Sequence, residues 1–210
     1  MQYIIFLLGL IISYCIGAIP TAYLFGKILK GIDIRQFGSG NVGATNALRV
    51  LGKGPGIIVL CLDILKGFIV AVNISDFFSP RIPAIPNPEI VRIIFGLVSI
   101  CGHNWTIFLN FKGGKGIATT LGVLFGLALR IHGLNAVLGL VILIWFIVFL
   151  LTRIISVASI CAGISLPILL IFFKQSPILI VTGFILCAFV ILRHKSNIER
   201  LRQGKEKRIF

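Results

Sequence analysis

The chain has 210 residues, of which 58% are hydrophobic and only 12% are charged, and its mean hydropathy is +1.08. This composition excludes an ordinary soluble domain and predicts several membrane helices of about 20 residues each, because the apolar runs lack the period-two alternation of a membrane β-barrel. The net charge is +14, from 20 Lys and Arg against six acids. The positive-inside rule and the attraction of anionic lipid headgroups explain such an excess of positive charge. An acidic substrate is a further explanation. Binding to a nucleic acid is disfavoured because the chain has no soluble module to present the charge.

Seven apolar stretches predict an all-α integral membrane protein that forms a single polytopic domain over residues 1–210. We expect the N-terminus outside and the C-terminus in the cytoplasm, because no Lys or Arg precedes the first stretch. The inside segments then hold 15 Lys and Arg and the outside segments four, a bias that supports this orientation. Gly17 and Pro20 are expected to kink or end the first helix, and four prolines predict an outside loop over 75–89. The predicted spans are 3–25, 54–73, 90–109, 117–129, 133–151, 154–173 and 177–192.

The first polar segment on the predicted cytoplasmic side is rich in small residues and opens with Gly38, Ser39 and Gly40. On a helix, Asn41, Thr45 and Arg49 would share one face. An amide, a hydroxyl and a guanidinium on one face suit a phosphate or a glycerol group. The alternative is an interfacial amphipathic helix whose Arg49 reaches for lipid phosphate.

The second polar segment packs two lysines and three glycines into five residues, Lys112, Gly113, Gly114, Lys115 and Gly116. Glycines let the backbone turn its N–H groups toward one point, and a helix beginning at Ile117 would add its positive N-terminal end. The pattern therefore predicts a phosphate cradle; the alternative is a glycine-rich interhelical turn with ordinary cytoplasmic lysines. His103, near the start of this segment, either binds substrate or holds the loop through a hydrogen bond.

The third polar segment begins at the end of the last predicted helix, where His194 and Asn197 are three residues apart and share a face. His194 could donate to a phosphate or act as a base. The alternative is that His194 has no role in binding and only interacts favourably with the negative end of the helix dipole at the C-terminus of the helix.

Two ionisable residues, Asp63 and Lys66, lie three apart inside the second predicted span. Charged groups inside a membrane are costly and are usually paired or functional. We expect a structural ion pair that helps to position the cytoplasmic loops.

Several known motifs are absent from the sequence. Lys115 is followed by Gly116, not by Ser or Thr, and no glycine lies five residues before Gly114, which excludes a Walker A loop. There is no GxSxG elbow of a serine hydrolase. The acids expected inside, Asp33, Glu199 and Glu206, are too scattered for a metal site. We therefore expect a phosphorylated substrate that itself carries the reactive group, and we expect no metal and no cofactor.

The segments 38–52, 102–116 and 194–206 resemble, in order, the three motifs of the bacterial glycerol-3-phosphate acyltransferase PlsY family. Asp33-Ile34-Arg35 and Asp63-Ile64-Leu65-Lys66-Gly67 also look like that family. The resemblance implies a seven-helix inner-membrane enzyme with a cytoplasmic active site. It implies transfer of a fatty acyl chain from acyl phosphate to the 1-position of glycerol 3-phosphate, giving lysophosphatidic acid and inorganic phosphate, the first step of bacterial phospholipid synthesis. It further implies no use of acyl-CoA, no HX4D motif and functional coupling to the acyl-phosphate-forming enzyme PlsX.

The match and the residue chemistry together define the candidate site. The catalytic candidates are Ser39, Arg49, Lys112, Lys115 and His194. The substrate-binding candidates are Gly38, Gly40, Asn41, Thr45, Asn46, His103, Gly113, Gly114, Gly116, Asn197 and Glu206. The family usually has proline where Thr106 stands, which predicts a looser start to the second loop, and arginine-glutamate where Lys195-Ser196 stand.

An acyl phosphate is already activated, so we expect the protein mainly to bring two anions together and to orient a hydroxyl. Arg49, a lysine of the second segment and the glycine N–H groups would neutralise the phosphates, and Ser39 and Asn41 would hold glycerol hydroxyls or the donor phosphate. No side chain is a compelling nucleophile, so we expect direct transfer, with the proton passing to the donor's phosphate or, less favoured, to His194. The acyl tail would lie among the apolar helices.

Two other classes of function stay open from the residues alone. A transporter for phosphorylated metabolites would need a polar path to the outside or an inverted repeat, and the sequence shows neither. A non-catalytic scaffold for anionic lipids would need positive charge but not Ser39 or the glycine pattern.

Overall fold

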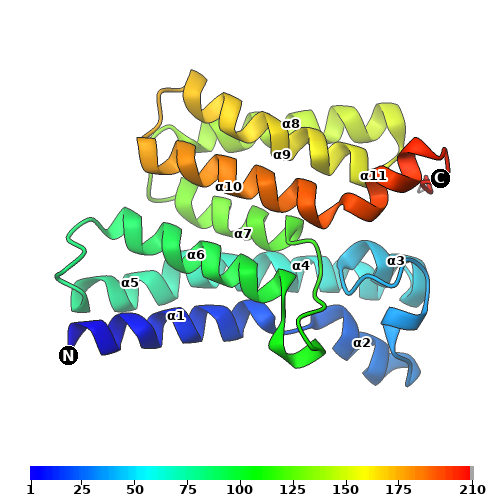
Figure 1. The fold of residues 1–210 in the computed structure, drawn as a ribbon, viewed down its shortest axis with the longest axis horizontal. Helices are drawn as coiled ribbons and strands as arrows, with labels where there is room; N and C mark the ends of the chain where they lie inside the picture. Colours follow the sequence, from blue (N-terminus) through cyan, green and yellow to red (C-terminus); the bar gives the residue numbers. More distant parts are fainter. Residues whose placement is uncertain (209–210) are drawn as a thin grey trace. The chain divides into compact units, whose positions relative to one another are not determined.

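All regular secondary structure that the computed structural model describes, over residues 1–208, is helical, which confirms the predicted fold class. The chain divides into two compact units, Met1–Leu127 and Ala128–Phe210. Figure 1 labels the α-helices of both units along the chain.

The first unit contains all the helices that surround the first two polar segments. Two short helices, α2 and α3, follow α1, and a longer helical stretch from α4 to η3 leads to α6 and α7 (Figure 1). Their bounds are α1 (Gln2–Ala18), α2 (Thr21–Lys30), the 3-10 helix η1 (Ile34–Gln36), α3 (Ala44–Leu51), α4 (Lys53–Ile69), the π-helix η2 (Val70–Ile74), α5 (Ser75–Phe78), the 3-10 helix η3 (Ser79–Arg81), α6 (Pro88–Asn104), the 3-10 helix η4 (Ile107–Leu109) and α7 (Ile117–Ala128).

Close helix contacts in this unit depend on glycines that face a neighbouring backbone. A Cβ atom on Gly17 of α1 would lie 2.0 Å from the Ser99 carbonyl oxygen of α6, and one on Gly122 of α7 would lie 1.9 Å from the Ile64 carbonyl oxygen of α4. Small residues of this kind let membrane helices approach closely, which is how such helices pack where lipid removes the hydrophobic driving force. α1 and α6 therefore lie side by side (Figure 1), and α7 packs on α4.

The second unit is built from α8, α9 and α10, with α11 after a bend at the end of α10 (Figure 1). The Trp145 indole Nε1 of α8 donates to the Ser159 hydroxyl of α9 at 3.2 Å. A Cβ atom on Gly163 of α9 would lie 3.0 Å from the Val190 side chain of α10, so α9 also packs tightly on α10. The bounds are α8 (Leu134–Thr152), α9 (Ile155–Phe172), α10 (Pro177–Arg193) and α11 (Lys195–Arg202).

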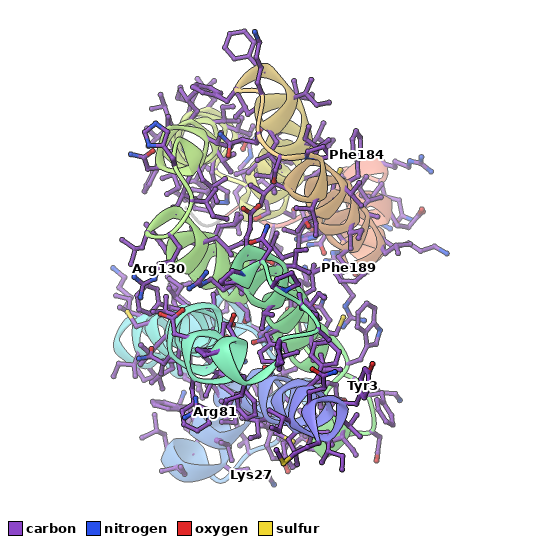
Figure 2. All side chains as sticks on the ribbon, turned by 90° about the vertical axis from the view of Figure 1, so that its left-hand side faces the viewer. Tyr3, Lys27, Arg81, Arg130, Phe184 and Phe189 are labelled. Carbon is purple, nitrogen blue, oxygen red and sulfur yellow. The ribbon has the colours of Figure 1, made fainter. Side chains whose placement is uncertain are left out.

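Large apolar side chains lie on the outside of both units, as expected for helices that face lipid. Tyr3 on α1 is 73% exposed and Phe184 on α10 is 55% exposed (Figure 2). In the described residues, four helical stretches are long and apolar enough to cross a membrane, and six are if each of two bent pairs, α1 with α2 and α10 with α11, is one span. α7 has 12 residues and so spans only about 18 Å, less than the hydrocarbon core. The count of seven spans and the orientation of the termini therefore stay predictions.

The structure confirms one expected helix break and corrects one predicted loop. The predicted first span, 3–25, breaks at Ile19 and Pro20 and bends by 41°, as the proline suggested. The predicted loop over 75–89 is helical as far as Arg81, which was not expected. Its prolines do not prevent this, because Pro80 lies within the first residues of η3, where a missing N–H costs little.

Candidate active site

The loop that carries Ser39, residues 37–43 between η1 and α3, is organised by one buried amide (the first loop). Asn46 is 1% exposed, its Oδ1 accepts from the Ser39 N–H at 2.8 Å, and its Nδ2 donates to the Phe37 and Ile34 carbonyls at 3.1 and 3.2 Å. Gly38 has φ +64°, and a Cβ atom there would lie 2.2 Å from the Asn46 Oδ1, so both the backbone and the amide require glycine. The side chain of Asn46 thus shapes the loop and leaves Ser39 exposed.

The helical face predicted for Asn41, Thr45 and Arg49 is only partly formed. α3 begins at Ala44, after Gly43 in an extended conformation, so Asn41 precedes the helix and its predicted place on that face is wrong. Thr45 and Arg49 both lie in α3, one turn apart, with Thr45 partly buried and Arg49 exposed. Gly40 is in the left-handed region, with φ +72°.

An ion pair not considered from the sequence supports the start of the first loop. The Asp33 carboxylate caps η1 by accepting from the Arg35 N–H at 3.0 Å, and it pairs with the Arg35 guanidinium at 2.6 Å. The guanidinium also lies 5.4 Å from the centre of the Tyr23 ring of α2. The hydrogen bond from Arg35 holds the pKa of Asp33 below its usual value.

The second loop, residues 105–116 between α6 and α7, folds back on the end of α6. The Gly113 N–H donates to the Asn104 carbonyl at 3.2 Å, and the Gly114 N–H donates to the His103 carbonyl at 3.0 Å. The expectation that these two N–H groups neutralise a phosphate is therefore wrong, because both are used to close the loop. Lys112 is exposed and Lys115 is partly buried.

The predicted helix after the glycines is present and begins at Ile117. Gly116, with φ +80°, makes the turn that starts it. The first N–H groups of a helix lack intrahelical partners and favour an anion. This end of α7, not the Gly113 and Gly114 amides, is the backbone feature of the second loop that suits a phosphate.

Thr106 does not loosen the start of the second loop, contrary to our expectation. Its side chain is 1% exposed, and its hydroxyl donates to the Ala18 carbonyl at the end of α1 at 2.6 Å. The Tyr14 hydroxyl of α1 donates to the neighbouring Trp105 carbonyl, also at 2.6 Å. A hydroxyl thus anchors this corner of the second loop.

The first two loops share one hydrophobic cluster within the first unit. Leu109 of the second loop is 4% exposed and belongs to the same buried cluster as Ile34 and Val42, which flank Ser39, and Ala47 of α3. The structure therefore brings together the predicted segments that carry Ser39, Arg49 and the two lysines, Lys112 and Lys115.

The third segment, residues 194–206, lies in the second unit. His194 joins α10 to α11 and is 2% exposed, with its Nδ1 2.8 Å from the Val190 carbonyl. Asn197 is 4% exposed and donates its side-chain N–H to Glu206. Lys195 and Ser196, at the start of α11, are exposed.

Glu206 is held by three protein groups. Its carboxylate accepts from Asn197, from the Arg200 guanidinium at 2.7 Å and from the Ser156 hydroxyl at the start of α9 at 2.8 Å. Ser156 was missed from the sequence because 50 residues separate it from Glu206. Burial disfavours the charge, but the hydrogen bonds from Asn197, Arg200 and Ser156 outweigh it and lower the pKa of Glu206 below its usual 4.5.

The lowered pKa of Glu206 predicts an acid-sensitive contact. A carboxylate with a depressed pKa stabilises the fold fully above its unfolded pKa and loses that contribution as the pH falls through its folded pKa. We expect Glu206→Gln to lower the stability at neutral pH by about 1 kcal/mol and to remove part of the stability loss below about pH 4.5. Thermal unfolding in detergent across the acidic range measures this. Glu199→Gln, whose partner Gln203 lies on the surface of α11, is the matched control, and an equal effect there would contradict the assignment.

Comparisons with known proteins place the chain among described relatives. The family model described as glycerol-3-phosphate acyltransferase matches residues 7–204. The chain is 41% identical to the glycerol-3-phosphate acyltransferase of Chlorobium phaeobacteroides (strain BS1), covering 95% of this chain and 94% of the relative, and 43% identical to glycerol-3-phosphate acyltransferase 2 of Moorella thermoacetica, covering 97% of each. The crystal structure of PlsY, an integral membrane glycerol 3-phosphate acyltransferase, in its glycerol 3-phosphate form matches with a TM-score of 0.85 and 39% identity over 98% of this chain and 96% of that one. The lysophosphatidic acid form matches with a TM-score of 0.82 and 38% identity, over 98% and 95% of the two chains.

Proposed function

Because the chain belongs to the glycerol-3-phosphate acyltransferase family, we propose that it transfers a fatty acyl chain from acyl phosphate to the 1-position of sn-glycerol 3-phosphate. The products are lysophosphatidic acid and inorganic phosphate. The observation that carries the proposal is that the segments with Ser39 and Arg49 share one buried cluster with Leu109, three residues before Lys112, in an integral membrane protein. The forms in which PlsY was solved, with glycerol 3-phosphate and with lysophosphatidic acid, agree with this substrate and product.

Positive side chains supply the charge that the two phosphates need. Arg49 is exposed on α3, and Lys112 is exposed before α7. A guanidinium can bind a phosphate through two parallel hydrogen bonds, and a lysine acts as a point charge. Together with Lys115 and the N-terminal end of α7, these groups bring the two anions together and lower the cost of their repulsion.

The transfer itself needs no nucleophile from the protein. The 1-hydroxyl oxygen of glycerol 3-phosphate attacks the acyl carbonyl, an ester C–O bond forms, and the bond from the carbonyl carbon to the phosphate oxygen breaks. The hydroxyl proton leaves with the phosphate. Ser39, presented by the Asn46-ordered loop, holds a glycerol hydroxyl or the donor phosphate, and Asn46 acts through the shape of that loop.

The resemblance also assigns roles to His194 and Asn197, which lie in the second unit. The Nδ1 of His194 lies against the Val190 carbonyl, so in the neutral ring Nδ1 carries the proton and Nε2 the lone pair. In our proposal His194 is the less favoured proton acceptor, and the donor's own phosphate is the favoured one. Glu206 positions Asn197 through its hydrogen bond.

The setting follows from the same proposal. The active site lies on the cytoplasmic side of a bacterial inner membrane, the acyl tail lies among the apolar helices, and an acyl-phosphate-forming enzyme such as PlsX supplies the donor.

The donor distinguishes this reaction from its alternatives. Purified protein in lipid, given glycerol 3-phosphate and palmitoyl phosphate, is expected to release inorganic phosphate and lysophosphatidic acid in equal amounts. Palmitoyl-CoA in a parallel reaction is expected to give no product. Product from palmitoyl-CoA alone would overturn the choice of donor. No product from either donor, in protein that is folded by size-exclusion chromatography, would overturn the reaction and direct the next experiment to transport of glycerol 3-phosphate into proteoliposomes.

A further inference from the structure

We propose that Asp63, a carboxylate buried in α4, is a positioning residue that acts through His103 on the Lys112–Gly116 loop; the inference rests on the proposed function for its effect on catalysis. Asp63 is 0% exposed. Its Oδ1 lies 2.8 Å from the Lys66 Nζ and accepts from the Thr21 hydroxyl of α2 at 2.7 Å. The ion pair expected from the spacing of Asp63 and Lys66 is therefore confirmed.

The pair is attached to the break between the first two helices. The Lys66 Nζ also donates to the Ile19 carbonyl at 3.1 Å, and Ile19 lies between α1 and α2. Thr21, the other partner of Asp63, is the first residue of α2. A buried ion pair in a membrane span is costly unless its remaining hydrogen bonds are made. These contacts give Asp63 a fixed position relative to the polypeptide around it.

The imidazole of His103 lies between Asp63 and the second loop. The His103 Nδ1 is 3.6 Å from the Asp63 Oδ1. On the other side of the ring, Nε2 lies 2.2 Å from the point where a Cβ atom on Gly114 would be. The His103 carbonyl accepts from the Gly114 N–H. The ring and the backbone of one residue thus support the glycine pair, and the ring faces a buried carboxylate.

A carboxylate beside Nδ1 favours the tautomer with its proton on Nδ1 and restricts rotation of the ring. Gly114 lies against that ring, so a ring that rotates would displace the loop. Lys112 and Lys115 flank the glycine pair and would move with it. Asp63 therefore sets the position of the phosphate-binding lysines without touching the substrate.

A double-mutant cycle tests whether Asp63 acts through His103. In full-length protein reconstituted in lipid, Asp63→Asn and His103→Gln are each expected to raise the KM for glycerol 3-phosphate by about tenfold, with a smaller change in kcat. If the effect passes through His103, Asp63→Asn added to His103→Gln is expected to change KM by less than about twofold. Additive effects of the two substitutions, or an unchanged KM in Asp63→Asn, would overturn the proposal.

A matched control removes another ion pair from the same unit. Asp76 of α5 pairs with Arg92, near the start of α6, at 2.6 Å, which is slightly closer than the 2.8 Å of the Asp63 pair. The Asp76 pair is more exposed than the Asp63 pair, and the second loop follows the other end of α6. Asp76→Asn is expected to leave the KM unchanged. A tenfold rise in that variant would mean that any lost ion pair disturbs the site, which would also contradict the proposal.

Two additions keep the test decisive. If Asp63→Asn alone does not fold, the double variant Asp63→Asn with Lys66→Met takes its place in the cycle. This variant removes both charges, and a single buried charge left without its partner costs more than the loss of the pair.

Hydrogen exchange of residues 112–116 needs no substrate. Faster exchange there in the Asp63 variant, absent in the Asp76 variant, supports the positioning role even if the wild-type protein makes no product, whereas unchanged exchange contradicts it.

Discussion

Arg49→Ala is expected to lower kcat/KM for glycerol 3-phosphate by about 10²–10³-fold, the loss that follows when a charge-assisted bidentate contact to a phosphate is removed. Arg49 is exposed on α3. α3 is held from its other side by Ala47 and Leu51, which are buried in the cluster with Leu109. The substitution should therefore leave thermal stability nearly unchanged, and the loss can be assigned to binding and catalysis.

Two further variants separate charge from geometry at this position. Arg49→Lys keeps the charge but loses the planar fork, so we expect an intermediate loss of about tenfold. Lys53→Ala removes an exposed charge from the start of α4, the next helix, and should change kcat/KM by less than about threefold. The measurement is initial rates of phosphate release against glycerol 3-phosphate concentration. A Lys53→Ala loss equal to that of Arg49→Ala would indicate that only the net positive charge of this face matters.

The sequence predicted the contacts that depend on short spacings along one helix or next to a helix break. Asp63 and Lys66 are three apart and form the expected pair, and a helix does begin at Ile117 after the glycines. The bend at Pro20 follows from its missing N–H and its fixed φ. In each case the physical cause lies within about one helical turn, so a single sequence is enough to find it.

The parts of the site that could not be predicted depend on groups far apart in the chain. Asn46 was expected to bind substrate, yet its amide is used by carbonyls nine and 12 residues away and by the Ser39 N–H. Glu206 meets Ser156 across 50 residues. The Gly113 and Gly114 amides were expected to face a ligand, but the fold returns them to the end of α6. A glycine in a loop indicates that another group approaches the backbone closely. The sequence alone does not show whether that group belongs to a ligand or to another part of the chain.

Because the amides of the second loop bind the end of α6 and not a ligand, a substitution at Gly113 tests the position of this loop more directly than a substitution at either lysine. A Cβ atom on Gly113 would lie 2.1 Å from the His103 carbonyl oxygen and 2.8 Å from the Asn104 carbonyl carbon. Both are backbone atoms at the end of α6 and cannot rotate away, so Gly113→Ala must move the loop or break its hydrogen bond to Asn104. We expect kcat/KM to fall by about 100-fold, the scale of a displacement of about 1 Å in a catalytic group.

The same clash should cost about 1–3 kcal/mol of stability, as overpacking does elsewhere, so thermal unfolding must accompany the rate measurement. Gly54→Ala is the matched control, because nothing lies within 4 Å of a Cβ atom there, and we expect it to retain both activity and stability. If Gly113→Ala is folded and keeps most of its activity, the loop tolerates displacement and Lys112 and Lys115 do not hold the reacting phosphates. If it is folded and inactive while Gly54→Ala is normal, the return of this loop to α6 is what places the lysines, and charge alone is not sufficient for transfer.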